Sequence, residues 1–395
     1  MIKKQVSVEE LRLGMYVVEL DRPWVGTDFA FQGFQVTCEE EIASLRSCCK
    51  TVFVDPERTH RGRGPGADEP VRGSTVYSEL ASVEQELPAA KEIYARYEHN
   101  AKRLFEHART ECELDAALVT GAVKSMTESI IRNPDAMLLL NRLYPKDSYE
   151  LGRALDTSIV MMVFGRFLQL PLQRLEVLGL AGMLLDIGKS GAAGVPAIAR
   201  PLYLREHDEG VKAHVMKSVE IIRGTPGLPS GVDDVVALHH ERQDGEGYPR
   251  ALAGAAISID GAIASLIDTY TELTSARPYA EQMSPSHALN TLHKLRGTLF
   301  HEALVEQFIQ CIGIYPVGSA VELNSGEIGL VVAQNPARRL QPRVMVILDG
   351  RRNPLPAQRM LDLLKEPKLG SDDVYRIRRA LPRDTLTIDA RDFVI

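Results

Sequence analysis

The sequence predicts a mainly α-helical protein with a small α+β domain at its N-terminal end and a small β-rich extension at its C-terminal end. From about residue 76 to residue 310, apolar residues recur three and four positions apart, which is the spacing of helices that bury one face. On either side, short runs of β-branched and aromatic residues alternate with glycine and proline, a pattern typical of strands and turns. A chain of 395 residues is also long enough for two or three domains.

Residues 1–56 predict the α+β domain. Gly14, Pro23 and Gly33 interrupt its apolar and aromatic clusters, so we expect short strands there. The segment EEEIASLRSCC has helical spacing, and KTVFVD has the pattern of one more strand. Residues 57–75 combine glycine, proline and mixed charge with almost no apolar side chain, so they gain too little burial to become ordered. We therefore predict a flexible linker at 57–75.

Residues 76–310 predict the helical domain, with its core between residues 145 and 310. Segments such as ELDAALVTGAVKSMTESIIR and GAIASLIDTYTELT carry the helical spacing. Residues 311–395 change period: GSAVELNSGEIGLVVAQ forms two alternating runs around an Asn-Ser-Gly turn, which indicates a β-hairpin, and RVMVILD indicates a further strand. This tail is the predicted β-rich extension.

Composition narrows the classes of function. The net charge of −7 argues against a protein that binds nucleic-acid polymers through a basic surface, but it is compatible with a basic pocket for a phosphorylated small molecule. The 5 cysteines show no CxxC spacing and suit a reducing compartment. The longest apolar run, Val177 to Leu185, is far shorter than the roughly 20 residues that cross a bilayer, and the N-terminus has no signal-peptide pattern. We expect a cytoplasmic protein that does not enter the membrane.

Several polar residues stand in strongly apolar surroundings. The triplet HHE at residues 239–241 follows the apolar run VVAL, and Asp186 directly follows the apolar run that ends at Leu185. Asp268 within SLIDTYTEL and His214 within KAHVMKSVEII are similar cases. A buried carboxylate needs a cation beside it, either a metal ion or a basic side chain. Imidazole nitrogen and carboxylate oxygen together suit divalent iron, manganese or zinc.

These motifs resemble the HD-GYP family, a branch of the HD metal-dependent phosphohydrolases that hydrolyses cyclic di-GMP. The matching strings are DIGK, HHE followed by DGEGYP, and IDTYTELTSARPY, and their order and spacing agree from Tyr149 to Tyr279. The resemblance implies an all-helical HD-type bundle. GMYVVELDRPW resembles the small domain that often precedes such modules in bacteria, and GIYPVGSAVELNSGEIGLVV resembles the tail often found after them.

The resemblance also implies roles for individual residues. The implied metal ligands are Asp186, His214, His239, His240 and Asp268. Asp186 would bridge two ions, while His240 would serve a third ion in members that bind three. The implied catalytic residues are Asp186 and Lys189, because the lysine would meet a substrate phosphate. The residues implied to contact substrate or a partner protein are Gly245, Gly247, Tyr248, Pro249 and Arg277.

Two departures from the family pattern affect the first metal. Leu185 stands where the family has the histidine of its His-Asp pair, and Arg153 stands where an earlier helix carries a second histidine. Leucine offers no lone pair, and arginine is a permanent cation that repels a divalent ion. We therefore expect one bound ion or none, with iron or manganese as the candidate metals. If Asp186 and Asp268 converge, Arg153 could supply the positive charge that the missing ion supplies elsewhere.

Two functions remain open at this point. The first is metal-assisted hydrolysis of cyclic di-GMP with reduced activity. The second is a catalytically inactive protein that binds cyclic di-GMP or a partner such as a diguanylate cyclase through the loop at residues 245–249. A third and weaker alternative is hydrolysis of another nucleotide phosphate by a general HD hydrolase. The histidines could also be relics packed around Asp186, and the sequence leaves open whether the chain forms a homodimer.

Overall fold

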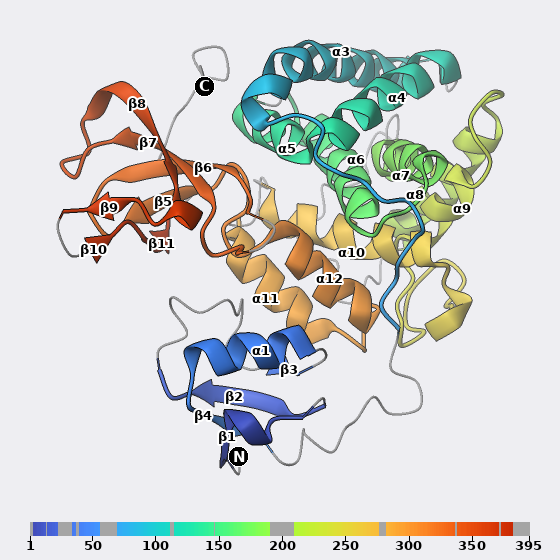
Figure 1. The fold of residues 1–395 in the computed structure, drawn as a ribbon. Helices are drawn as coiled ribbons and strands as arrows, with labels where there is room; N and C mark the ends of the chain where they lie inside the picture. Colours follow the sequence, from blue (N-terminus) through green and yellow to red (C-terminus); the bar gives the residue numbers. More distant parts are fainter. Residues whose placement is uncertain are drawn as a thin grey trace.

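The computed structural model describes residues 3–12, 14–22, 34–36, 39–55, 69–110, 114–145, 147–189, 209–275, 282–335, 338–370 and 373–381. A helical body lies between two small β-containing parts, as Figure 1 shows. The predicted mainly α fold with an α+β N-terminal part and a β-rich C-terminal part is confirmed. In the described ranges, no helix is both long and apolar enough to cross a membrane.

The N-terminal part is an antiparallel sheet with one helix. Its strands are β1 (Lys4–Ser7), β2 (Tyr16–Leu20), β3 (Phe34–Gln35) and β4 (Thr51–Val54), and their order in the sheet is β1-β4-β2-β3. A 3-10 turn, η1 (Val8–Glu10), follows β1, and helix α1 (Glu39–Cys48) precedes β4. Val17, Leu45 and Val52 are fully buried between the helix and the sheet. These apolar positions give this part a core of its own.

The helical body contains the described helices that follow residue 82. They are α3 (Val83–Thr110), α4 (Ala116–Arg132), α5 (Pro134–Leu143), α6 (Tyr149–Phe167), α7 (Leu172–Leu184), α8 (Glu209–Arg223), α9 (Val232–Leu238), α10 (Ile259–Thr274), α11 (Pro285–Leu295) and α12 (Glu302–Ile312). Ser148 caps α6 by accepting the N–H of Leu151, and Ser258 caps α10 by accepting that of Gly261. Helices α6 and α10 are buried along nearly their whole length, so polar residues on them lie inside the protein.

The C-terminal part is a five-stranded antiparallel sheet of order β11-β5-β6-β7-β8. The strands of the tail are β5 (Ala320–Leu323), β6 (Ile328–Ala333), β7 (Arg343–Leu348), β8 (Pro354–Asp362), β9 (Lys368–Leu369), β10 (Asp373–Val374) and β11 (Ile377–Ala380). The predicted hairpin is the β5–β6 pair, and its turn glycine, Gly326, has a φ of 82°. The end of β6 meets the helical body, because the N–H of Gln334 donates to Asp135 Oδ2 over 2.8 Å.

The predicted linker is only partly described, because residues 57–68 lie outside the described ranges. Residues 69–75 run along the helical body: Val71 exchanges hydrogen bonds of 3.0 and 2.8 Å with the side chain of Gln307, and the N–H of Gly73 donates to Leu168 O. The helical pattern predicted from residue 76 begins later than expected, at Val83. The second half of the predicted linker is thus attached to the helices by backbone hydrogen bonds.

Candidate metal centre

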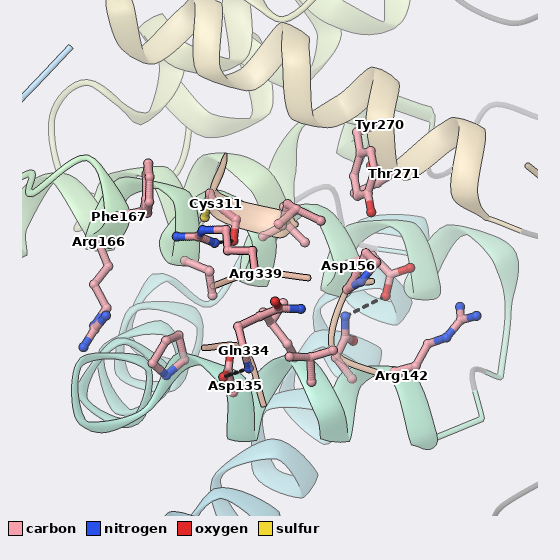
Figure 2. Close-up of a pocket in the computed structure, with 18 of the residues that line it drawn as sticks. Asp135, Arg142, Asp156, Arg166, Phe167, Tyr270, Thr271, Cys311, Gln334 and Arg339 are labelled. Carbon is pink, nitrogen blue, oxygen red and sulfur yellow. Dashed lines mark hydrogen bonds between the residues drawn. The ribbon is translucent and has the colours of Figure 1, made fainter. Parts of the chain in front are cut away.

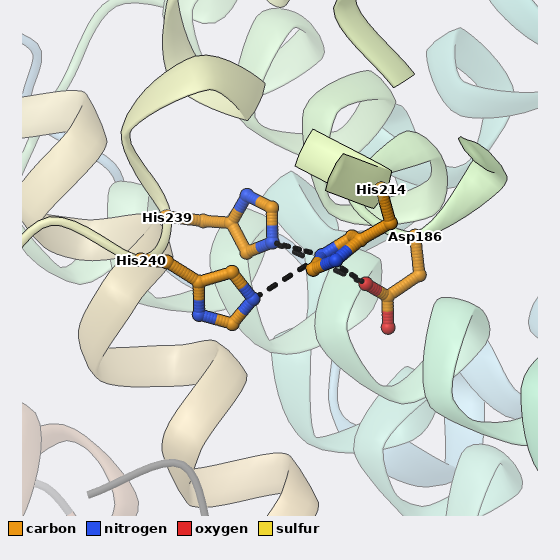
Figure 3. Close-up of side chains that lie close together, drawn as sticks. All are labelled: Asp186, His214, His239 and His240. Atoms are coloured by element: carbon orange, nitrogen blue, oxygen red, sulfur yellow. Dashed lines mark hydrogen bonds and ion pairs between the residues drawn. The ribbon is translucent and has the colours of Figure 1, made fainter. Parts of the chain in front are cut away.

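Four side chains with metal-binding atoms lie together beyond the end of α7. Asp186 follows that helix, His214 lies on α8, and His239 and His240 follow α9. Their ligand atoms all lie within 4.8 Å of one another. Figure 3 shows the three imidazole rings and the carboxylate gathered around His214. The structure therefore brings together four of the candidate ligands, while Asp268 lies outside this group.

The distances between these atoms fit the coordination of one ion. His214 Nε2 lies 3.2 Å from His240 Nε2 and 3.4 Å from His239 Nε2. Asp186 Oδ1 lies 3.3 Å from His214 Nε2 and 4.0 Å from His239 Nε2. Ligand atoms about 2.1 Å from a central ion at tetrahedral angles lie about 3.4 Å from one another. Small adjustments of these side chains would therefore suffice to surround a divalent ion.

Hydrogen bonds to backbone carbonyls determine which ring nitrogen of His214 and of His239 faces the cluster. His214 Nδ1 lies 2.5 Å from the carbonyl oxygen of Val211, and His239 Nδ1 lies 2.6 Å from that of Val236. A carbonyl oxygen only accepts, so each Nδ1 carries the proton and donates it. Both Nε2 atoms then present lone pairs to each other across 3.4 Å. A cation between them would remove this repulsion, and carbonyl hydrogen bonds of this kind orient histidines in metal sites.

The protonation of the cluster also suits metal binding. Burial lowers the pKa of His239 to about 4, and burial with the neighbouring histidines lowers the pKa of His240 well below its ordinary value. Burial alone would raise the pKa of Asp186, but the charge of Lys189 and the contact with His214 hold that pKa well below its ordinary value. At neutral pH, these groups are neutral imidazoles and an ionised carboxylate, the forms that ligate metals.

A turn anchored to α8 places Asp186. The 3-10 turn η2 (Ile187–Lys189) follows it, and Lys189 Nζ lies 2.8 Å from Asp186 Oδ1. Ser218 on α8 donates its hydroxyl to Leu185 O and accepts the N–H of Gly188, both over 2.9 Å. A Cβ atom on Gly188 would lie 2.4 Å from the carbonyl oxygen of His214, so only glycine allows this close approach. The turn and the helix that supplies His214 are therefore held together.

The segment after the paired histidines folds back onto them. Glu241 is 1% exposed, and its carboxylate accepts the N–H groups of Arg250 and Leu252 over 2.7 and 2.9 Å. The Tyr248 ring stacks on the His240 ring with centroids 4.6 Å apart, and the Tyr248 N–H donates to His240 O. The predicted contact residues Tyr248 and Pro249 thus lie directly beside the histidine cluster.

Glycines allow the tight path of this loop. A Cβ on Gly247 would lie 2.5 Å from the backbone nitrogen of Arg242, which leaves no room for a side chain. Gly245 has a φ of 77°, a conformation that favours glycine. Arg277, the last predicted contact residue, lies outside the described residues.

Arg153 and Asp268 form a separate, buried ion pair. Arg153 Nη2 lies 2.5 Å from Asp268 Oδ1, and Nη1 donates to the Asp268 carbonyl over 3.0 Å. The two side chains are only 8% and 3% exposed. Burial acts to lower the pKa of Arg153, but the charge of Asp268 together with those of other nearby acidic groups outweighs it and the pKa is raised, so the guanidinium stays charged. The carboxylate that the family resemblance assigns to a metal is here bound by an arginine.

The expected position of Arg153 between two aspartates is found for only one of them. Within the described part of the chain, Arg153 is at ion-pair distance from Asp268 alone, while Asp186 contacts Lys189 and the histidines. Leu185 is 2% exposed and presents no ligand atom. The first metal position therefore lacks both imidazoles, as the sequence predicts, and its remaining carboxylate is already neutralised.

Three residues that hold this arrangement together are absent from the predicted site. Glu241 fixes the loop, Ser218 fixes the Asp186 turn, and Thr271 Oγ1 lies 3.4 Å from Arg153 Nη1. Glu241 is visible in the sequence only as part of the HHE triplet. Ser218 carries no sequence signal, since serine is an ordinary residue in a helix pattern, whereas Thr271 stands where the resembling family usually has an acidic residue.

Comparison with known families agrees with the order of these parts. Residues 138–304 match the HD domain. Residues 3–119 match a domain of unknown function (DUF3391), and residues 320–370 match the KOW domain associated with HD domain. The described residues that gather into the metal cluster all fall within the HD domain match.

Two curated relatives extend the comparison. The chain is 30% identical over 377 residues to the cyclic di-GMP phosphodiesterase PA4108 of Pseudomonas aeruginosa, which covers 91% of this chain and 89% of that protein. It is 28% identical over 246 residues to the cyclic di-GMP phosphodiesterase response regulator RpfG of Xanthomonas campestris, covering 62% of this chain and 65% of that protein. With the matching motifs and the HD domain in place, the chain belongs to the HD-GYP family, a metal-dependent branch of the HD-domain proteins.

Proposed function

We propose that the protein hydrolyses cyclic di-GMP with a single metal ion, held by Asp186, His214, His239 and His240. The observation that carries this proposal is that four ligand atoms lie within 4.8 Å of one another. Two of them, His214 Nε2 and His239 Nε2, direct their lone pairs at each other. The relative from Pseudomonas aeruginosa, which matches along nearly the whole chain, is named as a cyclic di-GMP phosphodiesterase. Iron or manganese suits this mixture of imidazole and carboxylate ligands.

An ion at this position would act as a Lewis acid on the phosphodiester and make hydroxide available near neutral pH. The protein's own residues supply the rest. Lys189 Nζ lies 2.8 Å from Asp186 Oδ1 and is 27% exposed, so it can reach a phosphate oxygen beside the ion. Tyr248, stacked on His240, closes one side of the cluster and offers its ring to a substrate base.

Arg153 explains why one ion is expected. In a two-metal site, the ions stabilise the attacking and the leaving oxygens together. The buried Arg153–Asp268 pair leaves a fixed positive charge in the protein but no open coordination position. Loss of one such stabilising group costs roughly 10²- to 10³-fold in rate in other enzymes, so we expect slow turnover.

A second function rests on the same ion pair. If one ion is too few for catalysis, the protein would bind cyclic di-GMP, or a partner protein such as a diguanylate cyclase, through residues 245–249 without hydrolysis. The loop is held in place by Glu241 whether or not the site is catalytic. In both functions the protein binds cyclic di-GMP or its partner. Only in the first does it also form a hydrolysis product.

The deciding experiment measures anaerobic hydrolysis of cyclic di-GMP by the purified protein after loading with iron or manganese. His239→Ala removes a cluster ligand, and His287→Ala, an exposed histidine on α11, is the matched control. We expect slow turnover that His239→Ala abolishes and His287→Ala leaves intact. Binding of cyclic di-GMP without turnover in any metal-loaded sample would establish the second function instead.

A further inference from the structure

A second cavity lies away from the histidine cluster, between the helices and the C-terminal sheet. Its volume is about 590 Å³, and the candidate metal ligands do not line it. Figure 2 shows its wall, to which α5, α6, α10 and the segment after β6 contribute side chains. A volume of this size is typical of sites that enclose a small organic molecule. Nothing in the proposed hydrolysis uses this space.

Two arginines that line the cavity, Arg166 and Arg339, form no ion pair with any residue that the structure describes. Arg339 Nη1 donates to Cys311 O over 2.8 Å, and its guanidinium lies 5.4 Å from the centroid of the Phe167 ring. Arg166 donates to the carbonyl oxygens of Ile131 and Ser78 over 3.2 to 3.3 Å. Among the residues that the structure describes, neither arginine has a carboxylate at ion-pair distance. Both guanidinium groups donate to neutral carbonyls, and the carboxylates that act on them, Asp135 on both and Glu79 on Arg166, do so from beyond ion-pair distance.

Partial burial makes these charges costly. Burial lowers the pKa of Arg339 and of Arg166, although arginine remains protonated at any physiological pH. A desolvated cation that cannot lose its proton gains much from an anion that forms two parallel hydrogen bonds with it. The end of the cavity near Phe167 is therefore prepared for a carboxylate or a phosphate.

Acidic residues around the cavity do not replace such an anion. Asp135 lies on the same wall, but it accepts the N–H of Gln334, and burial raises the pKa of its carboxyl to about 6. Asp156 accepts an N–H of Asn141 over 2.9 Å at the other end of the view in Figure 2. Glu79 is exposed at the edge. Among the described residues, none of these carboxylates reaches ion-pair distance of Arg166 or Arg339, so the anion of a ligand can contact a guanidinium directly.

We propose that this cavity binds a small acidic molecule, with its carboxylate or phosphate at the guanidinium of Arg339, the charge of Arg166 on the same wall adding to the attraction, and its uncharged body along the apolar wall. Leu138, Val163 and Tyr270 provide that wall. The proposal does not depend on the proposed hydrolysis, since no cluster ligand takes part.

The position of the cavity connects it to the buried ion pair. Thr271 lines the cavity, and its hydroxyl lies 2.8 Å from Thr157 Oγ1 and 3.4 Å from Arg153 Nη1. Arg153 in turn holds Asp268. Thr271 thus connects the wall of the cavity to the residues around Asp268.

Calorimetric titration of the full chain with phenylphosphonate and with benzoate tests the proposal. The two probes share an aromatic body and differ in the acidic group, so the tighter one identifies the preferred anion. We expect one molecule to bind per chain, and Arg339→Gln and Arg166→Gln each to weaken binding by about tenfold or more. Arg338→Gln, which changes the exposed neighbour of Arg339, should leave the affinity unchanged.

Two further variants keep the outcome interpretable. Arg339→Lys retains the charge without the planar fork and should weaken binding less than Arg339→Gln, while thermal unfolding confirms that each variant is folded. His239→Ala should bind both probes as the wild type does. Absence of binding by both probes, equal affinity in the two arginine-to-glutamine variants and wild type, or loss of binding in His239→Ala alone would each overturn the proposal.

Discussion

The candidate site has two sides, which hold their carboxylates in different ways: an arginine side with Asp268 and Arg153, and a histidine side with Asp186 and the histidine cluster. Asp268 is 3% exposed and is satisfied within the protein by the guanidinium of Arg153. Asp186 is 29% exposed and faces His214 Nε2, which also meets the lone pair of His239 Nε2 across 3.4 Å. The arginine side is complete, and the histidine side still needs a cation. The facing lone pairs are where we propose that an ion from solution binds, and the buried ion pair is where we propose that an arginine takes the place of one.

Removing the arginine should give the largest effect. Arg153→Ala leaves the Asp268 carboxylate buried without a cation, and breaking a buried pair in this way costs about 3–5 kcal/mol of unfolding free energy. Urea unfolding measures the change. Arg109→Ala, which breaks an exposed pair with Glu150 at 50% exposure, should cost less than about 1 kcal/mol. Equal costs for the two variants would show that the arginine side is not a self-contained buried pair.

A third carboxylate sharpens the contrast, because Asp135 is buried and forms no ion pair with the residues that the structure describes. Its folded pKa of about 6 lies above the ordinary 3.8, so its contribution to stability is fully present below about pH 4 and is lost as the pH rises through 6. Asp135→Asn keeps an oxygen for the Gln334 N–H but cannot ionise. The difference in unfolding free energy between this variant and the wild type should therefore be about 2–3 kcal/mol more favourable to the variant at pH 8 than at pH 4. Parallel pH profiles for variant and wild type would contradict this assignment.

The loop beside the histidines should respond more weakly. Glu241→Gln leaves one oxygen to accept two N–H groups, so we expect a loss of about 1–2 kcal/mol. Hydrogen exchange of the Arg250 and Leu252 amides should become faster. Glu246→Gln, which changes an exposed glutamate of the same loop, should leave that exchange unchanged. Unaltered exchange in the Glu241 variant would mean that the loop is held by other contacts.

The smallest effect is expected at Ser218, which touches only the histidine side. Ser218→Ala removes the hydrogen bonds to Leu185 O and Gly188 N and should cost about 1 kcal/mol. Because it loosens the Asp186 turn, we also expect metal affinity to fall by about tenfold. Competition with a metal chelator measures that affinity. An unchanged affinity would show that the turn does not position the carboxylate.

Much of this site is predictable from local sequence. An aspartate after nine apolar residues and a histidine pair after VVAL must be buried, and buried groups of this type need a cation. Arg153 at a family histidine position likewise predicts the loss of one ion. The fold class follows from the change of apolar period along the chain, because periodicity is a local property that each segment carries by itself.

The remaining features depend on contacts between segments far apart in the sequence. The ion-pair partner of Asp186 is Lys189, three residues further along the chain, while Arg153 pairs with Asp268 on another helix. The cavity joins residues as distant as Tyr77 and Arg339, so no single segment reveals it. The backbone of residues 71–75 bonds to the Gln307 side chain and to carbonyl oxygens at the end of α6, and the composition of the segment does not encode these partners.

The most direct test counts the metal ions that remain tightly bound after anaerobic loading with iron or manganese and removal of excess ion. Elemental analysis of wild type, His239→Ala and His287→Ala gives the number per chain. Our account predicts one ion in wild type and in His287→Ala, and none in His239→Ala. Two or more ions in wild type would contradict it, because Asp268 would then have to release Arg153 and bind metal; no ion would show that the histidine cluster is complete without one.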